Sequence, residues 1–298
     1  MMIGTELGRF LPWEGLAKVP TEPITSAKEA MKLAGLDWLV DGRPLYDEDG
    51  NLVKDFVMNT RMSDKAPLYV VTKTYNRIQN FECYDFIEDL MQQKLAYVTG
   101  LELQGGRRIV FIVRSVEPKK VAGEAVTLYA ALTNAHTGLN SLQMMITPVR
   151  EASQTPLNIK LKKARRSVYL RHTRNVRDRM EDVQRVLGTA DKYLEELDNE
   201  GTRLAMHSID WAQFKNALFP EKERTHQRTE QMRELLEVAR HQPDLADYEG
   251  SAWQAVNAVA DVVSHMEPAR KGQRGLERRL ESFIDGYELL NKAYNIVA

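Results

Sequence analysis

Cysteine is almost absent from this chain, which holds one, Cys83, among 298 residues. A single thiol can form no disulfide within the chain, and it excludes a cysteine-rich metal site. Low cysteine content fits a reducing cytosol. Long apolar runs are also missing, and the first residues, MMIGTELGRFLPWEGL, lack the apolar core of a signal peptide. We therefore expect a cytoplasmic protein without a signal peptide or a membrane span.

Motifs of nucleotide, metal and hydrolase chemistry are missing as well. The sequence holds no GxxxxGK[ST] and no GxGxxG after a strand, so no nucleotide cradle is indicated. It has no HExxH and no GxSxG, and its six histidines have no metal-ligand spacing. Paired acids such as Glu88 and Asp89 lie in helical charge patterns, where a solvated face is the default. We expect no metal, no other cofactor and no enzymatic activity.

Positive charge is concentrated in one part of a nearly neutral chain. The formal net charge is -1, so no global field attracts nucleic acid or a membrane. Residues 151–180, however, hold nine Lys/Arg and two acids, which gives +7 there and leaves -8 for the rest. Such separation is what a binding face for a polyanion requires.

Local patterns predict an α+β protein in three segments. Residues 1–66 are mixed: Thr25 and Ser26 can cap a helix that stops at Gly35, and residues 49–51 (DGN) predict a hairpin turn. Residues 67–179 are strand-rich, and residues 180–298 are mostly helical.

The middle segment predicts about six strands around a helix. Residues 81–93 place apolar side chains at helical spacing, and residues 104–106 (QGG) form the tip of the clearest hairpin. A second hairpin has residues 134–141 as its connection. Hairpin connections indicate an antiparallel sheet packed with helices, instead of a βαβ series.

The C-terminal segment predicts a helical bundle. Its last part repeats large apolar residues at nearly 3.5-residue spacing, which predicts one continuous seam: Phe283, Tyr287, Leu290, Tyr294 and Val297. Packing within the chain is the favoured interpretation of this seam, and contact with a neighbouring subunit is the alternative.

The basic stretch is the first candidate site. We expect a short helix over 156–166, a strand over 167–171 and the start of a long helix near Arg174. Arginine and lysine would hold phosphates, and an aromatic ring inside the cluster would stack on bases. The candidate residues are Lys160, Lys162, Lys163, Arg165, Arg166, Tyr169, Arg171 and Arg174. The alternative is a solvated helix face neutralised by acids of residues 191–200.

Three smaller features could extend such a site. Arg107 and Arg108 follow the QGG tip, one for each face of the strand, and either present charge to a phosphate backbone or protect an exposed edge. The polar loop 133–141 around His136 either binds a polar ligand or simply connects two strands. A basic cluster over 270–279 either joins the site or forms a solvated face.

Several of these motifs, in this order, resemble a phage/plasmid-like family of unknown function. They are YVVTKTYNRIQNFECYDFIEDL, GLELQGGRRIVFIVRSVE, LTNAHTGLNSLQMMITPVR and RHTRNV, and the resemblance covers roughly residues 10–190. It implies a mobile-element protein in a bacterial cytoplasm. The family's usual acid after the loop histidine and its usual cysteine are replaced here by Thr137 and Ser153, which argues against a shared thiol chemistry.

The order of hairpins, helix and basic helix is also similar in kind to phage single-strand annealing proteins of the RecT, Red-beta and Erf type. That similarity implies ATP-independent binding of single-stranded DNA by a ring or filament. We therefore expect a non-catalytic annealing-type recombination protein that binds single-stranded DNA and copies of itself. The alternatives are a mobile-element protein that binds a host protein to modulate host machinery or defence, and an enzyme that uses the His136 loop.

Overall fold

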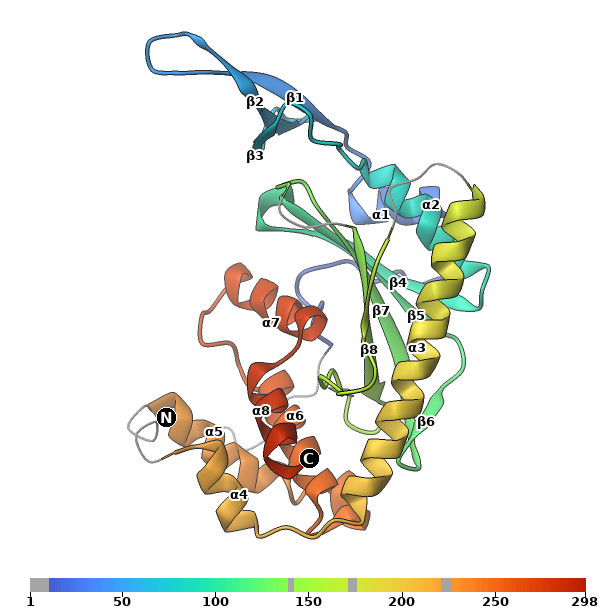
Figure 1. Ribbon diagram of the computed structural model, residues 1–298, viewed down its shortest axis with the longest axis vertical. Helices are drawn as coiled ribbons and strands as arrows, with labels where there is room; N and C mark the ends of the chain where they lie inside the picture. The colour runs from blue at the N-terminus through green and yellow to red at the C-terminus, as the bar shows by residue number, and fades with distance from the viewer. Residues whose placement is uncertain (1–10, 139–141, 171–175, 221–226) are drawn as a thin grey trace.

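The computed structural model describes residues 11–138, 142–170, 176–220 and 227–298. It confirms an α+β architecture of antiparallel sheets and helices with a helical C-terminal region (Figure 1). The strands are β1 (Val40–Tyr46), β2 (Leu52–Arg61), β3 (Pro67–Thr72), β4 (Leu95–Leu103), β5 (Arg108–Ser115), β6 (Lys119–Val121), β7 (Glu124–Ala135), β8 (Gln143–Arg150), β9 (Thr155–Pro156) and β10 (Ser167–Tyr169). The helices are α1 (Ala27–Ala34), α2 (Asn80–Met91), α3 (Val176–Ala205), α4 (Trp211–Leu218), α5 (Gln227–Ala239), α6 (Ala252–His265), α7 (Gln273–Asp285) and α8 (Glu288–Val297).

The main sheet is antiparallel, with the strand order β10-β8-β7-β5-β4. In addition, the short strand β6 pairs with β7, and β9 pairs with β8. The uninterrupted run of buried apolar residues over 109–113 of β5 is typical of a sheet that is covered on both faces. Ile109, Phe111 and Val113 face one core, whereas Val110 and Ile112 face the other. The predicted hairpin at residues 104–106 joins β4 to β5 through a short 3-10 turn.

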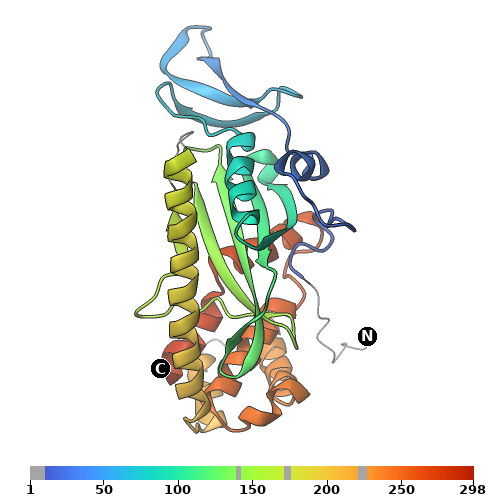
Figure 2. The ribbon, with the colours of Figure 1, turned by 90° about the vertical axis from the view of Figure 1, so that its right-hand side faces the viewer.

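One face of the sheet is covered by α1, α2 and α3 (Figure 2). The predicted helix caps are confirmed: Ser26 Oγ accepts a hydrogen bond from Glu29 N–H, and α1 ends at Gly35. The opposite face is covered by α7, where Trp13 packs against Tyr129 and Phe283 at ring-centroid distances of 5.3 and 5.6 Å. The segment boundary placed between residues 179 and 180 falls within α3.

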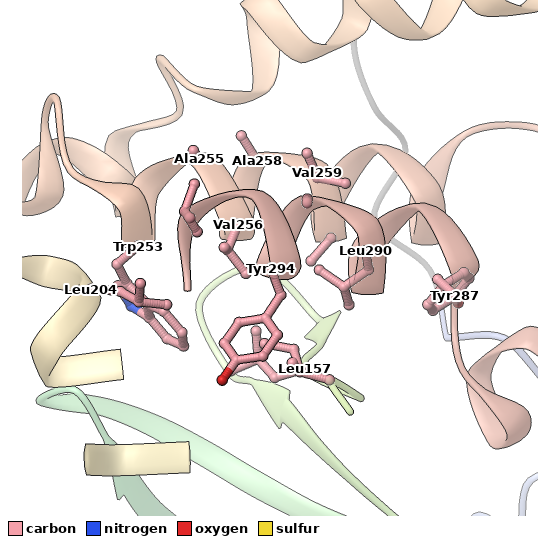
Figure 3. Close-up of a cluster of buried hydrophobic side chains, with 14 of the residues drawn as sticks. Leu157, Leu204, Trp253, Ala255, Val256, Ala258, Val259, Tyr287, Leu290 and Tyr294 are labelled. Carbon is pink, nitrogen blue, oxygen red and sulfur yellow. The ribbon is translucent and has the colours of Figure 1, made fainter. Parts of the chain in front are cut away.

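The C-terminal helices share a third core with β6, β7, β8 and α3, part of which Figure 3 shows. All five seam residues from Phe283 to Val297 are buried within the chain, so the intramolecular interpretation is confirmed and the seam offers no surface to a neighbour. The seam lies on two helices and not on one continuous helix. Gly286, at φ 111° and ψ 157°, separates α7 from α8. Only glycine adopts such angles readily.

The predicted helix over residues 156–166 is wrong. Leu157, Ile159 and Leu161 alternate toward the core with a period of two, which is the pattern of an extended chain. Tyr193 Oη of α3 donates to the carbonyls of Leu157 and Ile159, at 3.1 and 2.7 Å. These backbone groups are therefore satisfied across the core instead of along a helix.

A separate sheet of three antiparallel strands, in the order β1-β2-β3, projects beyond one end of the main sheet (Figure 1). We call these strands, residues 40–72, the arm. The predicted turn lies at its tip, where Asp47 Oδ1 accepts hydrogen bonds from the Asp49 and Asn51 N–H groups, and these bonds lower the pKa of the Asp47 carboxyl.

Arg150 joins the sheet to the helical region. Its buried guanidinium donates to both carboxylate oxygens of Glu124, forms an ion pair of 3.0 Å with Asp244, and donates to Ser153 Oγ. A buried arginine without such partners would cost several kcal/mol, about 3–5 in typical cases. The pairing fixes the 3-10 segment Pro243–Tyr248 against the end of β8.

Candidate functional site

The structure divides the predicted basic stretch. Four of its cations are exposed on the extended chain that precedes β10: Lys160, Lys162, Lys163 and Arg165. Lys163 Nζ lies 3.8 Å from Glu196 of α3, which is one acid of the 191–200 segment expected to neutralise it. Arg171 and Arg174 lie outside the described residues.

Arg166 requires a correction. Its side chain is buried, with the residue 7% exposed, and Nη1 donates to the Ile146 carbonyl and Thr147 Oγ1 at 3.2 and 3.5 Å. Burial lowers the pKa of this guanidinium, since it disfavours the charged form. A group held inside the fold cannot meet a phosphate at the surface, so Arg166 supports the sheet edge instead.

Tyr169 lies where a stacking role requires it. Alternation in the edge strand β10 buries Val168 and leaves Tyr169 66% exposed. Arg185 of α3, which the sequence did not indicate, donates to the Tyr169 carbonyl at 2.6 Å and forms an ion pair of 2.8 Å with Asp182, so its charge is engaged within the fold. Arg185 stands among mixed charges on a long helix, and only the packing of α3 beside β10 distinguishes it from the other charged residues there. Arg165, Tyr169 and Arg185 define the β10 edge surface.

A second basic surface lies between the tip of the β4–β5 hairpin and the first half of α7. It is a groove of about 900 Å³, which we call the α7 groove. Its lining residues are Gln104, Arg107, Arg270, Lys271, Gln273, Arg274, Glu277, Arg278 and Glu281. Two features that were separate in the sequence, the hairpin arginine and the cluster over 270–279, therefore meet. Arg279 of that cluster is half-buried and does not line the groove.

Polar contacts hold the hairpin tip to α7. Gln104 Nε2 donates to Glu281 at 2.8 Å, and the Arg108 guanidinium pairs with both carboxylate oxygens of Asp285, at 3.2 Å each. Arg108 is thus engaged within the fold, which corrects its expected role as a phosphate ligand. Arg107 precedes β5 and stays exposed toward the groove, so the two arginines do not alternate along one strand.

The cations of the α7 groove remain available to a ligand. Arg107, Arg270, Lys271, Arg274 and Arg278 are all exposed, and in the part of the chain that is described none of them forms an ion pair. The two acids of the groove accept hydrogen bonds from glutamines, Glu281 from Gln104 and Glu277 from Gln273. The α7 N-terminus has no side-chain cap, and its dipole adds positive potential there.

The residues around His136 connect the main sheet to α2 and to the arm. His136 is buried, its Nε2 lies 3.0 Å from Asn80 Oδ1, and its ring packs on Trp38 at 5.3 Å. Burial, and to a lesser extent the charge of Arg61, lowers the pKa of His136 to about 4. The His136 carbonyl accepts a hydrogen bond from Asn59 of the arm at 2.8 Å. Residues 139–141 of the predicted polar loop lie outside the described residues.

The described ranges offer few other candidates for a metal site or a reactive side chain. No cluster of three His, Cys, Asp or Glu side chains there could hold a metal ion. Cys83 is fully buried in α2, and burial raises the pKa of its thiol, so packing accounts for this residue. Among the helices described, none is both long and apolar enough to span a membrane.

The chain belongs to the family described as domain of unknown function (DUF932), whose model matches residues 67–284. The match runs from β3 to the end of α7 and includes both basic surfaces, whereas β1 and β2 of the arm lie outside it. No curated protein and no solved structure gives a significant match.

Proposed function

We propose that this protein binds single-stranded DNA through the phosphate backbone, without catalysis, as an annealing-type recombination protein. The observation that carries the proposal is the α7 groove, where five exposed cations line one concavity and its two acids are engaged. Each cation that neutralises a phosphate releases counterions, which gives salt-sensitive affinity without reading bases. A positively charged groove that follows the backbone is the usual means by which proteins hold single strands without reading their sequence.

The β10 edge surface supports the same function. Tyr169 offers a ring on which a base can stack, and stacking contributes about 1–3 kcal/mol per base for any sequence. Lys160, Lys162, Lys163 and Arg165 supply further phosphate contacts beside it. Two separate basic surfaces would let one protein hold a strand over an extended path.

The sequence resemblance gives the biological setting of the proposal. A phage or plasmid origin, a bacterial cytoplasm and assembly of copies into a ring or filament all follow from the similarity to mobile-element and RecT-type proteins. In this proposal the protein requires no nucleotide, metal or membrane. The single-stranded intermediates of phage recombination would be its natural ligand.

A salt titration with labelled oligo(dT) tests the proposal. The triple variant Arg107→Ala/Arg274→Ala/Arg278→Ala should bind more weakly and lower the slope of log K against log salt by about 2, since each lost phosphate contact removes ~0.7. The matched control Lys28→Ala/Lys32→Ala/Lys119→Ala removes the same charge from exposed sites elsewhere and should keep the slope.

Two outcomes would overturn the proposal: no binding by the native chain at low salt, or an equal change of slope in both triple variants. Pull-down from host lysate after nuclease treatment then separates the rival function. An acidic protein partner that survives nuclease, and that the groove variant fails to retain, would identify a factor that binds host protein.

A further inference from the structure

The tip of the β4–β5 hairpin has an uncommon backbone. Gln104, Gly105 and Gly106 all have positive φ, at 54°, 69° and 87°. Glycine adopts such angles freely, whereas a residue with a side chain, such as Gln104, adopts them rarely unless its surroundings hold it there. Arg107 of the α7 groove follows these three residues directly, so its position depends on the contacts that hold the tip.

Arg61, the last residue of β2 in the arm, makes such a contact. Its Nη2 donates to the Gly105 carbonyl at 2.8 Å, and its Nη1 pairs with Glu102 at 3.1 Å. The guanidinium lies over the ring of Trp38, 4.8 Å from the ring centroid, and the side chain is 14% exposed. The planar fork of arginine can bond a carbonyl and a carboxylate at the same time, so one group joins the arm to the tip.

The fit between Arg61 and the tip is close. A Cβ on Gly106 would lie 2.4 Å from Arg61 Nη2 and 3.3 Å from Glu102 Oε2, so both charged groups lie against the backbone that precedes Arg107. The Arg61 charge is engaged by Glu102 and by Asp64, whose carboxylate lies 3.7 Å away. Arg61 can therefore act on a ligand of the α7 groove only through the tip.

Two further contacts hold the ends of the same turn. Gln104 Nε2 donates to Glu281 of α7 at 2.8 Å, and the Arg107 carbonyl accepts a hydrogen bond from the His136 N–H at 2.8 Å. These bonds fix the beginning and the end of the turn, and Arg61 fixes its middle. Loss of the Arg61 contact would therefore loosen the segment that carries Arg107 while both ends stay attached.

We propose that Arg61 is a positioning residue for DNA binding, because it orders the hairpin tip so that Arg107 faces the α7 groove. This role rests on the proposed function of the groove, and it gives the arm a part in that function. Arg61 precedes the residues that the family model matches, 67–284, whereas Arg107 lies among them. A segment outside the family domain thus sets the geometry of a surface inside it.

Hydrogen–deuterium exchange of the full chain without DNA measures the order of the tip. In Arg61→Ala the amides of residues 103–108 should exchange at least about tenfold faster, since the tip loses a hydrogen bond to a charged group. The matched control Arg43→Ala removes an exposed arginine from the neighbouring strand β1 and should leave exchange at the tip unchanged. Equal exchange in Arg61→Ala and the native chain would overturn the role of Arg61.

A double-mutant cycle with oligo(dT) measures the effect on binding. Arg61→Ala should weaken binding and lower the salt slope by about 0.7, as Arg107→Ala does, although Arg61 contacts no phosphate. In the Arg107→Ala background, Arg61→Ala should have no further effect, because the group that it positions is gone. Equal weakening in both backgrounds would overturn the inference, since it would show that Arg61 contacts the strand itself or that its loss damages the fold generally.

A milder variant guards against misfolding. Arg61→Lys keeps the charge over Trp38 but lacks the fork, so both the exchange rate and the affinity should fall between those of the native chain and Arg61→Ala. Native affinity in Arg61→Ala would overturn the role of Arg61 and leave the proposed function standing. If the native chain bound no oligo(dT), the proposed function would fail, and the exchange measurement would decide by itself whether Arg61 orders the tip.

Discussion

At the scale of single residues, Arg165 and Arg166 are chemically identical neighbours in opposite surroundings. Arg165 is exposed, whereas the Arg166 guanidinium is buried and donates to the Ile146 carbonyl. We predict that Arg165→Ala lowers the salt slope of DNA binding by about 0.7 and leaves stability unchanged. Arg166→Ala should lower the free energy of unfolding by about 1–3 kcal/mol, because a buried acceptor loses its donor.

Urea unfolding and the DNA titration, run on both variants, check this pair. Arg165→Lys should restore the slope, since lysine also contacts phosphate as a point charge. A stable Arg166→Ala protein with a reduced salt slope would contradict the assignment of Arg166 to the interior.

His136 predicts a dependence of stability on pH. Its pKa is about 4 in the folded protein, lowered first by burial and second by Arg61, against 6.5 for an ordinary histidine. As pH falls below 6.5, the unfolded chain therefore takes up a proton that the folded chain resists. The contribution of neutral His136 is complete above pH 6.5 and is lost toward pH 4, by about 2 kcal/mol between pH 7 and pH 5.

Urea denaturation at the two pH values measures this loss. In His136→Gln the amide does not titrate, so the drop between pH 7 and pH 5 should be smaller by the same amount, and the remainder reports the carboxylates. Equal drops in both proteins would show that His136 is protonated in the folded state near its ordinary pKa.

At the scale of elements, the elements that the sequence predicts correctly are those with strong local signals. The Ser26 cap and the Gly35 stop define α1, and the turn residues define the hairpins of the arm and of β4–β5. The chain over 156–166 is mispredicted because its basic composition suggests a helix. Its period-two apolar pattern, and the Tyr193 bonds that satisfy its backbone, become evident only once α3 packs across it.

The candidate site shows the same division. The sequence shows the charges of Arg107 and of residues 270–279 separately, and each alone is weak evidence. Their meeting depends on α7 crossing the sheet to the β4–β5 tip, a long-range contact fixed by the packing of Leu280, Phe283 and Ile284. Conversely, the dense charge over residues 160–174 suggested more surface ligands for phosphate than the structure supports, because residues that are neighbours in sequence need not lie on the same surface.

Two helical glycines allow a test of how the α7 groove is built. A Cβ on Gly275 would lie 1.8 Å from the Arg270 carbonyl oxygen, whereas a Cβ on Gly188 of α3 would meet nothing within 4 Å. Gly275→Ala should therefore displace the chain that carries Arg270 and Lys271, cost about 1–3 kcal/mol and weaken DNA binding. Gly188→Ala should stabilise by about 0.5–1 kcal/mol and leave binding intact.

Thermal unfolding and oligo(dT) titration of the two glycine variants give the comparison. Opposite shifts of the melting temperature are expected, with the affinity changed only in Gly275→Ala. If Gly275→Ala bound DNA as tightly as the native chain, the start of α7 would not be part of the binding surface.

At the scale of the whole molecule, three apolar cores are linked by shared elements. Neighbouring residues of β8 enter different cores, since Met144 faces the α2 side, Met145 the α7 side and Ile146 the C-terminal helices. Helix α3 likewise contributes Val183 to one core and Leu197 to another. If the C-terminal helices separated from the sheet, they would expose apolar residues of β8 and α3, and these two elements also contribute residues to the other cores.

This linkage predicts one cooperative unfolding transition. Each core contains one buried tryptophan: Trp13, Trp38 or Trp253. A variant that keeps one of these three, with phenylalanine at every other tryptophan position, has a fluorescence signal that reports on a single core. Within every variant, the urea midpoint from fluorescence should coincide with that from far-UV circular dichroism, as two-state unfolding requires. The comparison is made inside each variant because the replacements lower stability by different amounts. A Trp253 midpoint below the dichroism midpoint would show that the helical region unfolds first, and that α3 and β8 do not couple the cores.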